Sequence, residues 1–105
     1  MTGSFDFDGN PISLWEWVLL FADSDRHVAL TAVGEDVEVS TVWMGVDYGF
    51  GRTESPLIYE TMIFGGDRDG DQWRTPNRDA ALAVHDQAVA LARDAKRSPG
   101  EVLAE

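Results

Sequence analysis

The chain has 105 residues, which is enough for one domain with a single modest core. Its 44% hydrophobic and 26% charged residues are typical of a folded protein and argue against intrinsic disorder. The net charge of −11 disfavours direct binding to nucleic acids or anionic membranes, because both surfaces are negative, and the lack of cysteine excludes disulfides and thiolate chemistry. With no signal-like start and no long apolar run, we expect a cytoplasmic protein.

The N-terminal part of the chain predicts a short helix after a polar segment. Residues 1–11 are rich in turn-forming residues, and we expect them and residues 98–105 to be flexible. Ser13 and Glu16 have the spacing of a capping box, in which each side chain hydrogen-bonds the backbone N–H of the other residue. The sequence therefore predicts a helix over residues 14–22.

The middle of the chain predicts strands. Residues 26–33 and 37–44 alternate between two faces and are rich in β-branched side chains, which favours a hairpin. A glycine-containing loop over residues 45–56 separates this hairpin from a third strand over residues 57–64. A turn then leads to a short strand over residues 72–74.

The last element is a longer helix. We expect Thr75 to cap it and Pro76 to occupy its first position. Small and apolar residues recur at helical spacing along one stripe: Ala81, Val84, Ala88, Leu91 and Ala95. The whole chain, residues 1–105, is therefore expected to form a single α+β domain. It comprises an antiparallel sheet of three to four strands with a short N-terminal helix and a longer C-terminal helix packed on one face.

No motif predicts a metal, a cofactor or a catalytic centre. Asp67, Asp69 and Asp71 alternate as calcium ligands can, but the glycine and glutamate positions of an EF-hand loop do not match, which favours an acidic turn. His27 and His85 have no histidine or cysteine at ligand spacing. The sequence predicts a non-enzymatic protein without a cofactor.

Glu60 interrupts an otherwise apolar strand and shares its face with Ile58, Met62 and Phe64. If that face is the core, Glu60 is partly buried and needs a cationic partner, for which the candidates are Arg26, Arg52 and Arg74. The pattern favours the alternative interpretation, in which Glu60 is an acid at the rim of the sheet.

The first helix is apolar on almost every side. One broad arc is predicted to face the core: Leu14, Trp15, Trp17, Val18 and Phe21. Leu19 and Leu20 fall outside that arc, so we expect a second covering layer. Either the N-terminal segment, through Phe5 and Phe7, or another protein molecule can supply it.

Three segments carry a resemblance to a known group of proteins. They are residues 39–47 (VSTVWMGVD), residues 60–65 (ETMIFG), and residues 72–74 (QWR) before an alanine-rich helix that contains His85. Over roughly residues 26–92 the chain resembles small proteins encoded by bacteriophages and prophages, many of them in actinobacteria. Relatives often carry Leu-Asp-His where this chain has residues 46–48 (VDY), so the resemblance implies no essential loop histidine. It implies a phage accessory protein acting inside the host bacterium.

The leading functional hypothesis is protein–protein binding, either to a host or phage protein or by self-association as a dimer. Leu19 and Leu20 form one predicted surface, and the loop region forms the other with Trp43, Asp47, Tyr48, Phe50 and Glu60. These aromatic residues can alternatively fill the core. A second hypothesis is an acidic mimic of nucleic acid that inhibits a host or defence enzyme. A third is a small enzyme that uses Asp47 or Glu60.

Overall fold

The computed structural model describes residues 3–23, 25–47 and 55–96. Its elements are β1 (Ser4–Phe5), β2 (Pro11–Ile12), α1 (Leu14–Asp23), β3 (His27–Val33), β4 (Val37–Trp43), β5 (Tyr59–Phe64), β6 (Gln72–Thr75) and α2 (Arg78–Lys96). The predicted α+β class is confirmed, with both helices and the sheet close to their expected bounds.

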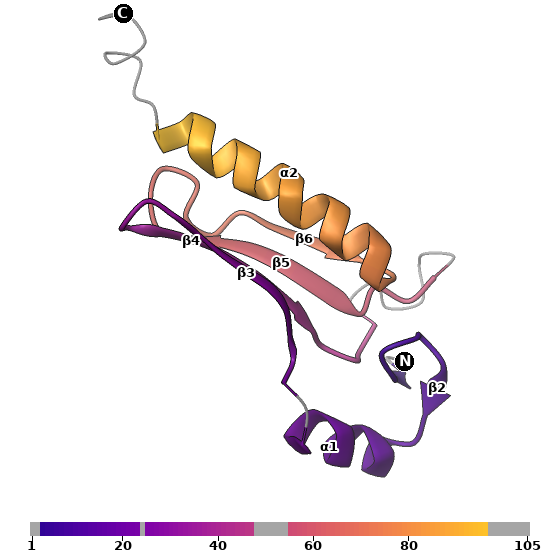
Figure 1. Cartoon of the computed structure of the whole chain (residues 1–105). Coiled ribbons are helices and arrows are strands. Elements are labelled where there is room, and N and C mark those ends of the chain that lie inside the picture. Colours follow the sequence, from indigo (N-terminus) through magenta and orange to yellow (C-terminus); the bar gives the residue numbers. More distant parts are fainter. Residues whose placement is uncertain (1–2, 24, 48–54, 97–105) are drawn as a thin grey trace, which may run out of the picture.

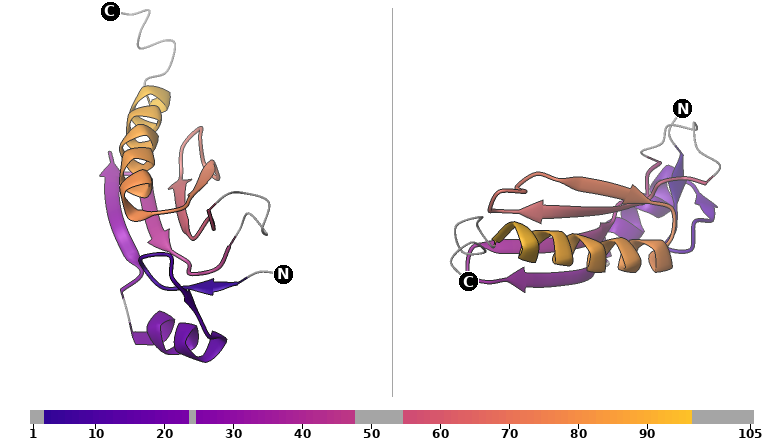
Figure 2. Two further views of the ribbon diagram at one scale, coloured as in Figure 1. Left: turned by 90° about the vertical axis from the view of Figure 1, so that its right-hand side faces the viewer. Right: turned by 90° about the horizontal axis from the view of Figure 1, so that it is seen from above.

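The four longer strands form an antiparallel meander in the order β3-β4-β5-β6, and α2 lies along one face of this sheet (Figure 1, Figure 2). β1 and β2 form a separate small hairpin. α1 lies beyond the end of the sheet at which β3 begins, away from α2, and the hairpin lies between α1 and the start of α2 (Figure 1). Neither described helix has the length and apolar character needed to cross a membrane.

The start of α2 differs from the prediction. Asn77 caps the helix, because its side-chain oxygen accepts a hydrogen bond from the Ala80 N–H at 2.8 Å. Thr75 is instead the last residue of β6, where it is buried. Pro76 and Asn77 form the turn between the end of β6 and the start of α2. The cap is therefore Asn77, two residues after the predicted Thr75.

Two apolar clusters fill the space between the sheet and α2. The cluster near the β3–β4 turn contains Val33, Val37, Val39, Ile63, Ala88, Val89 and Ala92. The cluster near α1 contains Trp43, Ile58, Tyr59 and Ala81. Thr41, Thr61 and His85 are also buried, and they lie between these clusters along β4, β5 and α2. The buried stripe of α2 therefore includes His85, while the predicted Val84 and Leu91 are only half-buried.

The N-terminal hairpin is tied to the core by polar contacts. The Trp43 indole N–H donates to the Asp6 carbonyl at 3.2 Å, and the Tyr59 hydroxyl donates to the Phe7 carbonyl at 2.6 Å. Burial raises the pKa of this Tyr59 hydroxyl. The predicted flexibility of residues 1–11 stays a prediction, but residues 3–11 supply acceptors that two buried side chains need.

Candidate functional site

α1 begins at the predicted capping box. The Glu16 N–H donates to the Ser13 hydroxyl at 3.1 Å, and the Ser13 N–H donates to a Glu16 carboxylate oxygen at 3.2 Å. The helix is anchored to the sheet by Trp17, whose indole N–H donates to the Met44 carbonyl at 3.0 Å. Gly45 makes this approach possible, because a Cβ at its position would collide with the indoles of Trp17 and Trp43.

The orientation of α1 corrects part of the predicted arc. Trp17, Leu20 and Phe21 pack against the cluster around Trp43, so Leu20 belongs to the core side rather than to the uncovered side. Arg26 lies over the Phe21 ring, with its guanidinium carbon 4.1 Å from the ring centroid. Because α1 sits beyond the end of the sheet, only one narrow side of it meets the core.

The opposite side of α1 is exposed. Leu14 is 68% exposed, Trp15 69%, Val18 38% and Leu19 51%. We call these four side chains the apolar face of α1. Leu14, Trp15 and Val18 were predicted to face the core, and that prediction is wrong; Leu19 was predicted to lie on the uncovered side and does. Phe7 does not cover this face, because its ring packs against the Trp43 ring in a tilted arrangement with centroids 4.4 Å apart.

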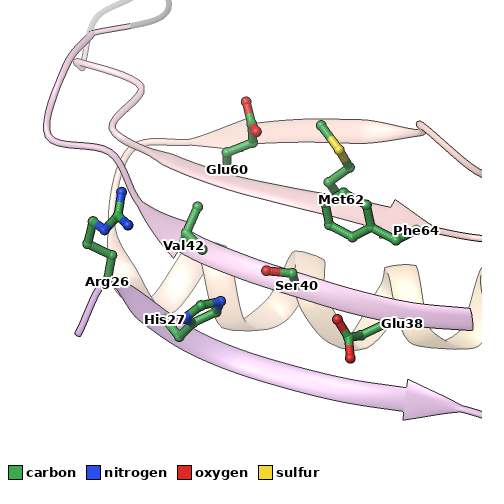
Figure 3. A pocket seen from close by; sticks show the side chains of 8 residues that line it. All are labelled: Arg26, His27, Glu38, Ser40, Val42, Glu60, Met62 and Phe64. Atoms are coloured by element: carbon green, nitrogen blue, oxygen red, sulfur yellow. The ribbon is translucent and has the colours of Figure 1, made fainter.

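A second uncovered surface lies on the side of the sheet opposite α2. β4 contributes Glu38, Ser40 and Val42, which pair across the strands with Phe64, Met62 and Glu60 of β5. We call this surface the open face of the sheet. With Arg26 and His27 these side chains line a hollow of about 430 Å³ (Figure 3). Leu30, opposite Ser40 on β3, adds a side chain that is 55% exposed.

Glu60 lies on this open face and not in the core. Its carboxylate accepts a hydrogen bond from the Arg74 guanidinium at 3.3 Å, so one of the three candidate arginines is its partner. The Glu60 side chain is 17% exposed, and Arg74 sits directly opposite on β6. Met62 and Phe64 share its face as predicted, whereas Ile58 precedes β5 and is buried in the core.

Two other predicted binding residues, Trp43 and Asp47, are buried and do not form an exposed surface with Glu60. Trp43 is fully buried, so it fills the core and is not available as an exposed anchor. Asp47 is 6% exposed and accepts a hydrogen bond from the Leu57 N–H at 2.9 Å, which fixes one end of the loop to the other. Tyr48 and Phe50 lie outside the described residues.

His85 is buried in the core, where it is hydrogen-bonded to two threonines. Its Nε2 lies 2.8 Å from the Thr31 hydroxyl and its Nδ1 lies 2.8 Å from the Thr41 hydroxyl. Thr41 also contacts the Thr61 hydroxyl at 2.6 Å. A neutral imidazole has one donor and one acceptor, which suits two hydroxyl partners. Burial lowers the pKa of His85, with a smaller opposing effect from Asp86.

Two carboxylates of the acidic turn between β5 and β6 make contacts within the turn. Asp69 accepts a hydrogen bond from the Gly65 N–H at 2.7 Å, and Asp71 pairs with Arg68 at 3.0 Å. Among the described residues, no group of histidine or acidic side chains has the arrangement of a metal site. These contacts make the segment a hydrogen-bonded turn.

No protein-family model, curated protein or solved structure matches this chain. Two uncovered surfaces, the apolar face of α1 and the open face of the sheet, are the candidate functional sites of the described residues. Neither surface was predicted with its correct residues. The signal for the first was the apolar character of α1 on nearly every side, and the signal for the second was the alternation along β4 and β5.

Proposed function

We propose that this chain is a protein-binding module that acts through the apolar face of α1. The observation that supports it is the exposure of Leu14, Trp15, Val18 and Leu19 on a helix whose other side is already packed. The largest contiguous apolar patch on the surface of a protein is often a functional one. Tryptophan is also enriched among the residues that dominate binding energy.

The proposal places this module in a biological setting taken from the sequence. The resemblance to bacteriophage and prophage proteins favours a non-enzymatic accessory role in the cytoplasm of a host bacterium. A helix that presents one apolar face is suited to a groove or a flat sheet on a partner, where side chains at positions i, i+1, i+4 and i+5 form the contact.

The test compares two variants that each add one negative charge at an exposed helical position. Leu19→Glu changes the apolar face of α1, and Ala90→Glu changes the exposed side of α2. At a concentration where the chain is monomeric, we expect both variants to unfold at the same denaturant concentration as the wild type. Only Leu19→Glu should lose binding, measured by capture of proteins from a bacterial lysate and by the concentration dependence of the chain's own mass. Unchanged capture and mass for Leu19→Glu would refute the proposal.

An acidic mimic of nucleic acid is the alternative proposal, and one observation favours it. The β3–β4 turn with Glu35 and Asp36 lies against the β5–β6 turn with Asp67 and Asp69. Their close approach is shown by the Asp36 carbonyl, which leaves no room for a Cβ at Gly65. This arrangement gathers acids at one end of the sheet. We expect binding to DNA-processing enzymes at low salt, weakened by Asp67→Asn and not by Asp86→Asn. No binding across a panel of such enzymes would refute this alternative.

A further inference from the structure

The apolar face of α1 and the open face of the sheet are two unpartnered surfaces on one chain, and each has a shape that suits the other. A helix is roughly 10 Å across, which covers about two strands spaced about 4.8 Å apart. The hollow on the open face is lined mainly by two strands, β4 and β5. A helix seated there would give the sheet a helix on each face, as α2 already provides on the other side.

We propose that the occupant of each surface is a second copy of this chain, so that α1 of each protomer packs on the open face of its partner. This inference rests on the proposed function, because it takes the apolar face of α1 to be a binding surface. α1 lies beyond the end of the sheet, away from α2 (Figure 1, Figure 2). Two copies related by a two-fold axis can therefore each place α1 on the open face of the other.

The area is sufficient for a stable contact. Trp15 is 69% exposed, which corresponds to on the order of 100–170 Å² for a tryptophan. The whole apolar face of α1 then offers on the order of 300–400 Å². A dimer in which the open face loses an equal area, and in which the two-fold axis repeats the contact, buries roughly 1,200–1,600 Å², the size of a standard specific interface.

The hollow carries charges of both signs although the whole chain carries −11. Arg26 and His27 line the end of the hollow near α1, and Glu38 lines the other end. Glu60 on the open face is already paired with Arg74. The acidic turns stand at the opposite end of the sheet. The four side chains of the apolar face of α1 carry no charge, so they meet this mixed surface without charge repulsion. Salt should strengthen the contact by screening the repulsion between the two acidic molecules.

The first experiment measures mass by sedimentation equilibrium over a range of concentrations and at two salt concentrations. We expect a dimer whose dissociation constant decreases as salt increases. Leu19→Glu and Phe64→Glu should each weaken dimerisation at least about tenfold, because each places a carboxylate in the apolar contact. Ala90→Glu is the control with the same added charge. A monomeric wild type at all concentrations would overturn the proposal.

Mixing the two impaired variants distinguishes the exchanged arrangement from other dimers. In a mixed dimer one of the two contacts joins a wild-type α1 to a wild-type sheet, whereas neither variant alone can form an intact contact. We therefore expect the mixture to dimerise more tightly than either variant alone. A dimer that is weakened by Leu19→Glu but not by Phe64→Glu would overturn the exchange, while keeping α1 as a binding surface and the proposed function intact.

The absence of cysteine allows a direct test of proximity. Trp15→Cys in one molecule and Phe64→Cys in another should be joined by a short bismaleimide, because α1 of one copy faces β5 of the other. Ala90→Cys, on the exposed side of α2, is the control and should not be joined to Phe64→Cys. Preferential joining of Trp15→Cys to itself would indicate helix-to-helix packing and would overturn the proposed arrangement.

Discussion

The two faces of the sheet are built from the same strands, but one is buried and the other is uncovered. Along β4, Val39, Thr41 and Trp43 are fully buried under α2 and the N-terminal hairpin, while the intervening side chains line the hollow. The covered face holds apolar clusters and a hydrogen-bonded polar row. The open face mixes methionine, phenylalanine and valine with an ion pair. Alternation creates two faces, but only the packing of a helix against one of them decides which becomes the core.

The largest difference between the faces should appear between neighbours on β5. Ile63 is fully buried and Phe64 is 47% exposed. We expect Ile63→Ala to lower the free energy of unfolding by about 2–5 kcal/mol, because it leaves a cavity in the core. Phe64→Ala should cost about 1 kcal/mol or less. Both are measured by denaturant unfolding at a concentration where the chain is monomeric. Equal losses would mean that the open face is covered within the single chain.

The polar row on the covered face should make stability depend on pH. Burial lowers the pKa of His85 below its usual 6.5, so below that pH the unfolded chain binds a proton that the folded chain does not. Stability from this group is complete above pH 6.5 and decreases as pH falls, by at most about 1.4 kcal/mol per pH unit, until the folded pKa is reached.

The measurement compares denaturant unfolding at pH 7.5 and 5.5 for the wild type and His85→Gln. The variant should lose the part of the pH dependence that comes from the imidazole. His27→Gln replaces the histidine on the exposed side and should keep that part. If His85→Gln and the wild type have the same pH dependence, the buried imidazole does not control it.

The smallest effect should come from the ion pair on the open face. A double-mutant cycle with Glu60→Gln and Arg74→Gln should give a coupling of at most about 1 kcal/mol, because Arg74 is 35% exposed and solvent screens the pair. The Arg68–Asp71 pair, with both side chains 42% exposed, is the control and should couple less strongly. Coupling well above this limit at concentrations where the chain dimerises would indicate that a partner covers the open face.

Local signals determined much of the fold. The capping box at Ser13 and Glu16 predicted where α1 begins, and its hydrogen bonds form as expected. Alternation and β-branched residues predicted the strands, and helical spacing predicted α2. These features depend on residues a few positions apart, so they can be read from the sequence.

Long-range contacts decided the rest. The rotation of α1, and hence the exposure of Leu14, Trp15 and Val18, follows from a hydrogen bond between Trp17 and Met44, which are 27 positions apart. The His85 imidazole is hydrogen-bonded to the Thr31 hydroxyl, 54 positions away in the sequence. The sequence alone determined that α1 has more apolar side chains than one core contact can bury. Only the tertiary structure decided which of them stay exposed, because a short helix beyond the end of a sheet can bury a single side.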